Sequence, residues 1–347
     1  MKRAVKFALF IFLLIIPQKT YAEEVKVGVT FSQVQCEYLD LNWRKIYKKT
    51  MALDLDVIRL GAYWSRIEKS RDKFDFSELD WQIQQAKENN IPVLLTVGMK
   101  APRWPEYFIP AWLMKDLSFR FGSAVSDRKI IKERSLLFIR RVVERYKKEA
   151  IIVAWQVENE PLNRAGPKDW RIRNDFLQEE IDLVEKLDTR SRPIVINAMT
   201  YLNRILRFFN RLIYTKNPVY QIIDIADIPA FNIYSTIGHK LIGQKICFLT
   251  VPQKRLKYLK RFVDYAKAQD KTVWVTELQA EPWEPGELVH IRKEAAITCR
   301  AEDFPVSFGE LEYLGVDTVF FWGVEYWFYR MQYYKDKSWL DAFEQIP

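Results

Sequence analysis

The chain has 347 residues, which is long enough for one large domain, and its formal net charge is +9. Its two histidines and three scattered cysteines (Cys36, Cys247 and Cys299) exclude a disulfide framework and a histidine-based metal centre, so no metal or other cofactor is expected. One disulfide bridge remains open. No basic patch interleaved with aromatic residues indicates a nucleic-acid partner.

Residues 1–22 have the pattern of a secretory signal. Basic residues precede an apolar run at 7–16, and small residues lead to a cleavage site after Ala22. The alternative, an uncleaved membrane anchor, is weakened because ten apolar residues are short for spanning a bilayer. We therefore expect export to the cell envelope or beyond, with no stable membrane insertion of the mature chain, whose net charge would be +5.

Residues 23–347 alternate short apolar strands with amphipathic helices and contain no linker or repeat, which predicts a single α/β domain. Helices are expected, among other places, at 39–51, 129–148, 170–187 and 256–268, with a last helix within 327–343. The expected strands are 25–31, 57–60, 91–98, 151–161, 193–198, 227–235, 272–277 and 318–324.

The stretch 151–161, IIVAWQVENEP, reads as a buried strand that leads into polar residues. Asn159 and Glu160 stand at its carboxyl end, and Pro161 cannot extend the strand. Barrels and open α/β sheets keep catalytic groups at the carboxyl ends of their strands. Glu160 is therefore a candidate catalytic residue.

A second β-branched run, TVWVTE at 272–277, stops on Glu277. Glu160 and Glu277 are 117 residues apart, which is about three strand-and-helix units of roughly 40 residues each. This spacing places Glu160 after a fourth strand and Glu277 after a seventh. The carboxyl ends of those strands face each other across a barrel.

Asn-Glu-Pro after strand 4 and Thr-Glu after strand 7 resemble the retaining glycosidases of clan A, over nearly the whole chain. The resemblance implies a (β/α)8 TIM barrel. Trp155 and Gln156 ahead of the Asn-Glu pair are similar to the β-galactosidase-like family 42, whereas Pro161 is similar to families 5 and 39. The choice among these families stays open.

The resemblance also implies roles for site residues. Glu160 would be the acid/base, with a raised pKa, and Glu277 the nucleophile, the two carboxyl groups lying about 5–5.5 Å apart. Arg59 and Tyr234 would hold the nucleophile ionised, although a structural ion pair for Arg59 and a rim position for Tyr234 stay open. Asn159 would bind the sugar 2-hydroxyl, and Trp322 would lie under the sugar.

Two loops at the expected mouth are rich in aromatic residues. In the long stretch 99–116, Trp104 and Trp112 either form a sugar platform or pack the loop down. The stretch after Glu277 adds Trp283 to the substrate-binding candidates and Glu281 as a third carboxylate.

The pattern as a whole predicts a retaining O-glycosyl hydrolase that cleaves β-glycosidic bonds of an oligo- or polysaccharide through a covalent glycosyl-enzyme. An alternative is a secreted carbohydrate-binding barrel without hydrolytic activity. A further alternative is an envelope-attached structural protein held by its N-terminus. Fold alone decides none of these, because barrels host many chemistries.

Overall fold

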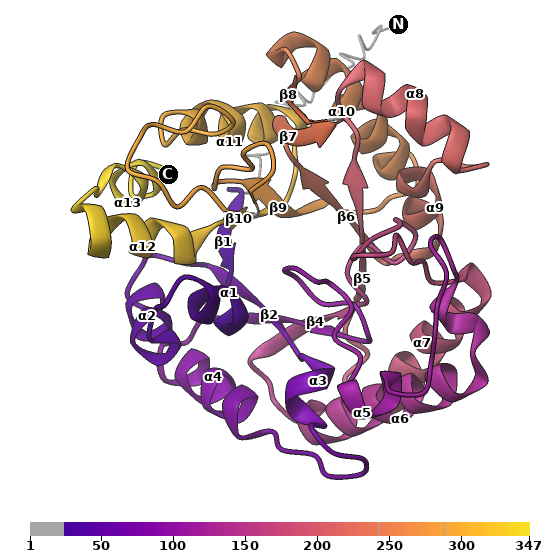
Figure 1. Ribbon diagram of the computed structural model, residues 1–347. Coiled ribbons are helices and arrows are strands. Elements are labelled where there is room, and N and C mark those ends of the chain that lie inside the picture. Colours follow the sequence, from indigo (N-terminus) through magenta and orange to yellow (C-terminus); the bar gives the residue numbers. More distant parts are fainter. Residues whose placement is uncertain (1–23, 242, 288) are drawn as a thin grey trace, which may run out of the picture.

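Residues 24–241, 243–287 and 289–347 are described by the computed structural model, so the predicted signal at 1–22 lies outside the described residues. Eight parallel strands close into a barrel inside a ring of helices (Figure 1), which confirms the predicted fold class. The order around the barrel is β1-β10-β9-β6-β5-β4-β3-β2. Its strands are β1 (Lys26–Thr30), β2 (Val57–Gly61), β3 (Val93–Val97), β4 (Ile152–Val157), β5 (Ile194–Thr200), β6 (Ile228–Ile233), β9 (Trp274–Gln279) and β10 (Thr318–Trp322).

The strands are short apolar runs because both faces are covered, by the barrel interior and by the helices. Every residue of β3, VLLTV, is buried. The expectation of coverage on both faces is wrong at the start of β4, where Val153 is 39% exposed. There β4 pairs with β5 only from Trp155 onward, so the first residues extend past that neighbour.

Amphipathic helices follow the strands and cover the barrel. Helix α4 begins at Ser77, where the Ser77 amide donates to Asp75 Oδ1 at 3.0 Å. The final helical segment is two helices rather than one. The helices are α1 (Gln33–Tyr38), α2 (Trp43–Thr50), α3 (Trp64–Ile67), α4 (Ser77–Glu88), α5 (Ala111–Met114), α6 (Lys129–Tyr146), α7 (Asn174–Leu187), α8 (Arg204–Ile213), α9 (Pro218–Ile225), α10 (Pro252–Lys267), α11 (Asp303–Leu314), α12 (Val324–Tyr334) and α13 (Ser338–Phe343).

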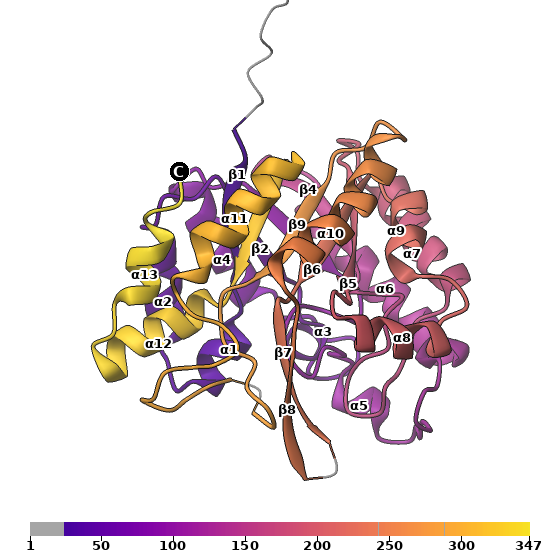
Figure 2. The ribbon, with the colours of Figure 1, turned by 90° about the horizontal axis from the view of Figure 1, so that it is seen from above.

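Additional elements stand at the carboxyl ends of the strands, the mouth of the barrel. An antiparallel hairpin of β7 (Thr236–Leu241) and β8 (Gln244–Leu249) extends outward from this end, and α8 lies beside it (Figure 2). The sequence did not predict the hairpin or α8. Both belong to the βα connections at the carboxyl ends of the strands, and these connections vary most among TIM barrels.

No helix within the described ranges is long and apolar enough to cross a membrane. The three cysteines are free: Cys36 and Cys299 are buried and Cys247 is exposed. The bridge that the sequence left open is therefore not formed.

Candidate active site

The Glu160 side chain enters the mouth from the turn after β4. Glu158 and Glu160 both have a positive φ, 61° and 47°, which non-glycine residues adopt mainly where the surrounding structure enforces it. The Glu160 amide donates to Asn197 Oδ1 at 2.6 Å. Asn232 Nδ2 donates to Glu160 Oε1 at 2.7 Å. Strand β5 thus holds the backbone of Glu160 through Asn197, and strand β6 holds its side chain through Asn232.

Arg59, at the middle of β2, is fully buried, and each of its guanidinium nitrogens has a partner. Its Nε donates to Gln156 Oε1 at 2.7 Å and its Nη2 to Asn159 Oδ1 at 2.7 Å. Its Nη1 forms an ion pair with Glu277 Oε1 at 2.9 Å. One guanidinium group therefore connects β2, β4 and β9, and a buried ion pair with further hydrogen bonds is the arrangement in which such a charge is tolerated.

Glu277 lies inside β9, two residues before its end, so the expectation that the strand stops on this glutamate is wrong. Its second carboxylate oxygen accepts from the Tyr234 hydroxyl at 2.6 Å. Burial and the Glu277 charge raise the Tyr234 pKa well above its usual value, so the hydroxyl keeps its proton and donates it to this bond. Both oxygens of Glu277 are thus engaged by the residues that the resemblance pointed to.

A chain of side-chain hydrogen bonds joins the surroundings of the two glutamates. Asn197 Nδ2 donates to Asn159 Oδ1 at 3.0 Å and to Thr276 Oγ1 at 3.0 Å. Thr276 Oγ1 donates to Asn232 Oδ1 at 2.6 Å. In the sheet, Asn232 pairs directly with Glu277. Asn232 therefore donates to Glu160 and also stands opposite Glu277 in the sheet, so both glutamates belong to one buried polar network.

The electrostatics of Glu160 differ from those of Glu277. Burial, and then the charges of Glu106 and Glu277, raise the pKa of Glu160 to about 8. Its carboxyl group is consequently protonated at neutral pH, whereas Glu277 is in an ion pair with Arg59. A carboxyl group with a raised pKa and a second one that is held in an ion pair have the arrangement of a general acid and a nucleophile.

Lys100 and Glu106, from the loop after β3, were missed by the sequence reasoning. Lys100 is fully buried, and its Nζ donates to the Glu160 carbonyl at 2.8 Å and lies 3.3 Å from Glu106 Oε2. Burial raises the pKa of Glu106, and the charge of Glu277 raises it further. The aromatic residues of 99–116 drew attention to this loop, but no pattern singled out these two charges.

Trp322, at the end of β10, packs against Met199 and Tyr234. The Arg103 guanidinium carbon lies 3.8 Å from the centre of one of its ring systems. Arg103 is also paired with Glu281 and with Glu325, so the third carboxylate candidate is taken up in a buried ionic cluster. Arg103 therefore lies over the buried indole that the resemblance assigned to the sugar.

The other predicted tryptophans differ in their surroundings. The Trp283 ring stands edge-on to Tyr234 at 5.3 Å between centroids, so it packs on the tyrosine that is bonded to Glu277. Trp104 is 47% exposed, and no contact in the described part of the chain connects it to either glutamate. Trp112 donates through Nε1 to the Glu68 carbonyl at 2.9 Å and packs against the core, so it holds the loop down.

Asn159 keeps its amide nitrogen for another partner, because its Oδ1 accepts from Arg59 and Asn197 and no acceptor within the described ranges is bound to Nδ2. Within these ranges no three His, Cys, Asp or Glu side chains are grouped so that they could hold a metal ion.

Comparison with known families connects this geometry to glycosidases. Residues 37–190, slightly less than half of the chain, match the family model described as "Beta-galactosidase", glycoside hydrolase family 42. A curated relative, beta-galactosidase BbgII from Bifidobacterium bifidum, is 29% identical over an alignment of 117 residues, and the match covers 30% of this chain and 16% of that protein.

Solved structures share the fold at low identity. A beta-galactosidase from Halorubrum lacusprofundi matches with a TM-score of 0.58 at 15% identity, over 86% of this chain and 52% of that one. An endo-beta-1,4-xylanase of family 10 from Gloeophyllum trabeum matches with a TM-score of 0.54 at 14% identity, over 87% of this chain and 85% of that one.

The chain thus spans about half the length of the solved β-galactosidase from Halorubrum lacusprofundi, and its match covers a smaller share of the curated relative. In its eight-stranded barrel and in the family match of residues 37–190, the chain resembles the glycoside hydrolases of clan A, as its sequence indicated.

Proposed function

We propose that the protein is a retaining β-glycosidase in which Glu160 is the acid/base and Glu277 the nucleophile. The observation that carries this proposal is the contrast between the two carboxyl groups of one network. Glu277 is paired with Arg59 and Tyr234, whereas Glu160 is buried, accepts from the Asn232 amide and has a pKa raised to about 8. Retaining hydrolysis requires one ionised and one protonated carboxyl group at the same sugar.

In the first step, a Glu277 oxygen attacks the anomeric carbon and forms a glycosyl ester bond, while the bond from this carbon to the leaving oxygen breaks. Glu160 gives its proton to that oxygen. Tyr234 and Arg59 stay bonded to the Glu277 carboxylate and orient it. The amide nitrogen of Asn159 is available to the sugar 2-hydroxyl, a bond that strengthens as charge develops on the ring.

In the second step, Glu160 is a carboxylate and takes a proton from water, whose oxygen attacks the anomeric carbon. The ester bond breaks and Glu277 leaves as a carboxylate. Two inversions at the same carbon return the original β-configuration. Formation of the ester neutralises the Glu277 charge, and this charge is one cause of the raised Glu160 pKa, so the change helps Glu160 to act as a base.

We propose β-galactosides as the first substrates to test, because the matching family model and the curated relative are both described as β-galactosidase. A family 10 xylanase also shares the fold, so aryl β-xylosides, β-glucosides and β-mannosides belong in the same panel. The 1–22 segment supports a place of action outside the cytoplasm, which fractionation of cells that produce the full chain would test.

The deciding experiment compares the wild type with Glu277→Ala and Glu160→Ala on this panel. Glu277→Ala should lose roughly 10³-fold or more of its turnover, because no group remains to form the ester. Azide should then restore product of inverted configuration. Glu160→Ala should keep activity mainly on aryl glycosides with good leaving groups, which need no proton.

Glu133→Ala, which alters an exposed glutamate of α6, is the matched control and should behave as the wild type. If both site variants also matched the wild type, the assignment of the two glutamates would be wrong. If the wild type bound sugars and hydrolysed none of the panel, the carbohydrate-binding barrel would be the better interpretation.

A further inference from the structure

Helix α8 carries an exposed apolar surface that the glycosidase proposal does not use. Ile205, Phe208, Phe209 and Leu212, here called the α8 ridge, are 54%, 59%, 54% and 69% exposed. At 100° per residue they fall on one face of the helix. Leu249, 64% exposed, lies beside the start of the helix, where Asn203 Nδ2 donates to the Leu249 carbonyl at 2.8 Å. Contiguous apolar surface of this kind indicates a binding partner.

The surroundings of the α8 ridge are strongly basic. Residues 189–263 contain thirteen Lys and Arg but only two Asp and no Glu. On α8 itself, Arg204, Arg207 and Arg211 follow the ridge residues around the helix, and the helix has no acidic residue. An amphipathic helix with aromatic and aliphatic residues on one face and arginines on the other is typical of helices that lie in a membrane interface.

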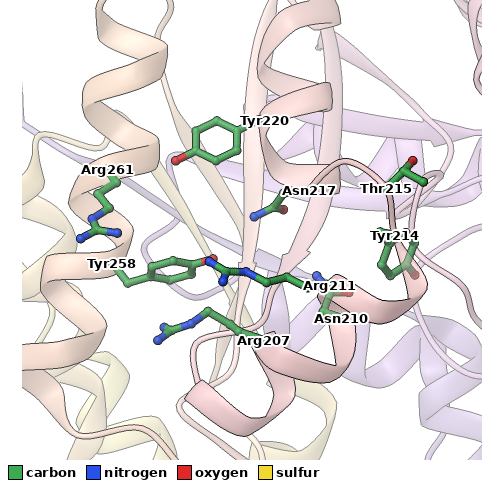
Figure 3. A pocket seen from close by; sticks show the side chains of 9 residues that line it. All are labelled: Arg207, Asn210, Arg211, Tyr214, Thr215, Asn217, Tyr220, Tyr258 and Arg261. Atoms are coloured by element: carbon green, nitrogen blue, oxygen red, sulfur yellow. The ribbon is translucent and has the colours of Figure 1, made fainter.

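A pocket of about 330 Å³ opens between α8, α9 and α10, next to the basic side of α8 (Figure 3). Arg207 and Arg211 reach it from α8 and Arg261 from α10, while Tyr214, Tyr220 and Tyr258 contribute their rings. No carboxylate lines it, and none of the three arginines forms an ion pair with a described residue. Arg207 is stacked on Tyr258 at 4.2 Å and bonded to the Leu202 carbonyl at 2.7 Å, so it is held in position.

We infer that α8 and this pocket form a docking site for an anionic phospholipid surface. Three clustered, unneutralised arginines bind a phosphate group by charge-assisted hydrogen bonds. The α8 ridge would then enter the region between headgroups and acyl chains, which explains why apolar and basic surface occur side by side. A soluble anion would account for the pocket and leave the exposed phenylalanines unexplained.

The position of this docking site relates it to the barrel mouth. The Leu206 side chain, on the inner side of α8, packs against the cluster of Met199, Tyr234 and Trp322 at the mouth. Docking through α8 would therefore hold the mouth close to the lipid surface. The inference stands whether or not the barrel hydrolyses glycosides, because none of its residues is part of the proposed catalytic network.

Vesicle flotation tests the inference with the full chain. Vesicles of phosphatidylglycerol in phosphatidylcholine should bind the wild type at least about tenfold more tightly than phosphatidylcholine alone, and added salt should weaken the binding. Phe208→Ser with Phe209→Ser, and separately Arg211→Gln with Arg261→Gln, should each reduce the binding to phosphatidylglycerol vesicles by roughly tenfold. Every variant keeps residues 1–22, so differences between variants report the docking site.

Matched controls change equivalent residues elsewhere. Tyr313→Ser alters a 74% exposed aromatic residue of α11, and Lys129→Gln with Arg140→Gln removes two exposed charges from α6. These variants should bind vesicles as the wild type does, and all variants should keep their turnover on a soluble aryl glycoside and their melting temperature.

Three results would overturn the inference. The first is vesicle binding that the α8 and pocket variants leave unchanged. The second is a wild type that ignores vesicles but forms a dimer that Phe208→Ser with Phe209→Ser dissociates, which would assign the α8 ridge to a second copy of the chain. The third is binding of inorganic phosphate in solution, lost in Arg211→Gln with Arg261→Gln, without any vesicle binding.

Discussion

At the scale of the residue, Arg59 organises the candidate site. It is bonded to Gln156, Asn159 and Glu277, which come from β4, the turn after it and β9. A buried cation with this many partners positions each of them, and each partner in turn neutralises or orients the cation. Removal of Arg59 and removal of Glu277 should therefore not have additive effects.

Arg59→Met should lower the free energy of unfolding by about 3–5 kcal/mol, because it leaves the Glu277 carboxylate buried without its counter-ion. The double variant Arg59→Met with Glu277→Gln should recover part of this loss, since no charge is then left unpaired. Urea denaturation of the wild type, both single variants and the double variant forms the thermodynamic cycle. A double variant no more stable than Arg59→Met would show that the amide contacts of Arg59 matter more than its charge.

Glu106 should tune the acid/base. Its charge is a cause of the raised pKa of Glu160, so Glu106→Gln should move the alkaline limb of the kcat/KM profile to lower pH. In the wild type this limb should fall near pH 8, where Glu160 loses the proton that the leaving group needs. Glu302→Gln, at an exposed position before α11, is the control and should leave the profile unchanged. An alkaline limb that Glu106→Gln does not move would separate Glu106 from the acid/base.

At the scale of the element, the β7–β8 hairpin and the 281–286 loop support each other beside Glu277. The Gly238 amide donates to the Trp283 carbonyl at 2.9 Å, and the Trp283 ring meets Tyr234 edge-on. The hairpin extends from the mouth (Figure 2). The backbone contact at Gly238 anchors it to the 281–286 loop. The position of the hairpin is therefore fixed at Gly238, where the neighbouring backbone leaves no room for a side chain.

Gly238→Ala should disturb this contact, since a Cβ there would lie 2.4 Å from the Pro285 nitrogen and 2.5 Å from the Trp283 carbonyl oxygen. We expect a loss of roughly ten- to hundredfold in kcat/KM through displacement of Trp283, while the barrel stays folded. The matched control is Gly309→Ala in α11, where nothing lies within 4 Å of the added carbon. It should leave activity unchanged and stabilise the helix by about 0.5–1 kcal/mol. Unchanged kinetics in Gly238→Ala would exclude the hairpin from the site.

At the scale of the whole molecule, the barrel buries several carboxyl groups whose pKa values are raised. Burial raises the pKa of Glu160 to about 8 and that of Glu158 and Glu281 to about 7. Glu158 accepts from the Met99 amide at 2.8 Å and so ties the loop after β3 to β4. These groups keep protons in the folded state that the unfolded chain releases near their ordinary value of 4.5.

The melting temperature should therefore decrease as the pH rises from about 5 to about 8. Over this range the folded state binds more protons than the unfolded state, so each step to higher pH favours unfolding. Glu160→Gln should show a smaller decrease, because it removes one of the groups responsible. Calorimetry across this pH range provides the measurement. A melting temperature that rises towards pH 8 would contradict the raised pKa values.

The sequence by itself predicted the strands of the barrel and placed Glu160 and Glu277 at two of them. Strand identity depends on runs of about six apolar residues, and the carboxyl end of each run is visible in the same local pattern, so Glu160 and Glu277 could be assigned to facing strands before any contact was known. The contacts of Arg59 and Tyr234 with Glu277 came only from the resemblance to clan A, and the structure contains both.

Only the tertiary structure decided what surrounds these residues. Lys100 and Glu106 reach Glu160 through a loop whose path depends on contacts with β4, and no local pattern encodes that path. The cover of Arg103 over Trp322 and the basic pocket between α8 and α10 also join residues that are distant in the chain. The positions of the strands follow from residues that are adjacent in the sequence. The positions of loops and surface helices depend on packing between residues that are distant in the sequence.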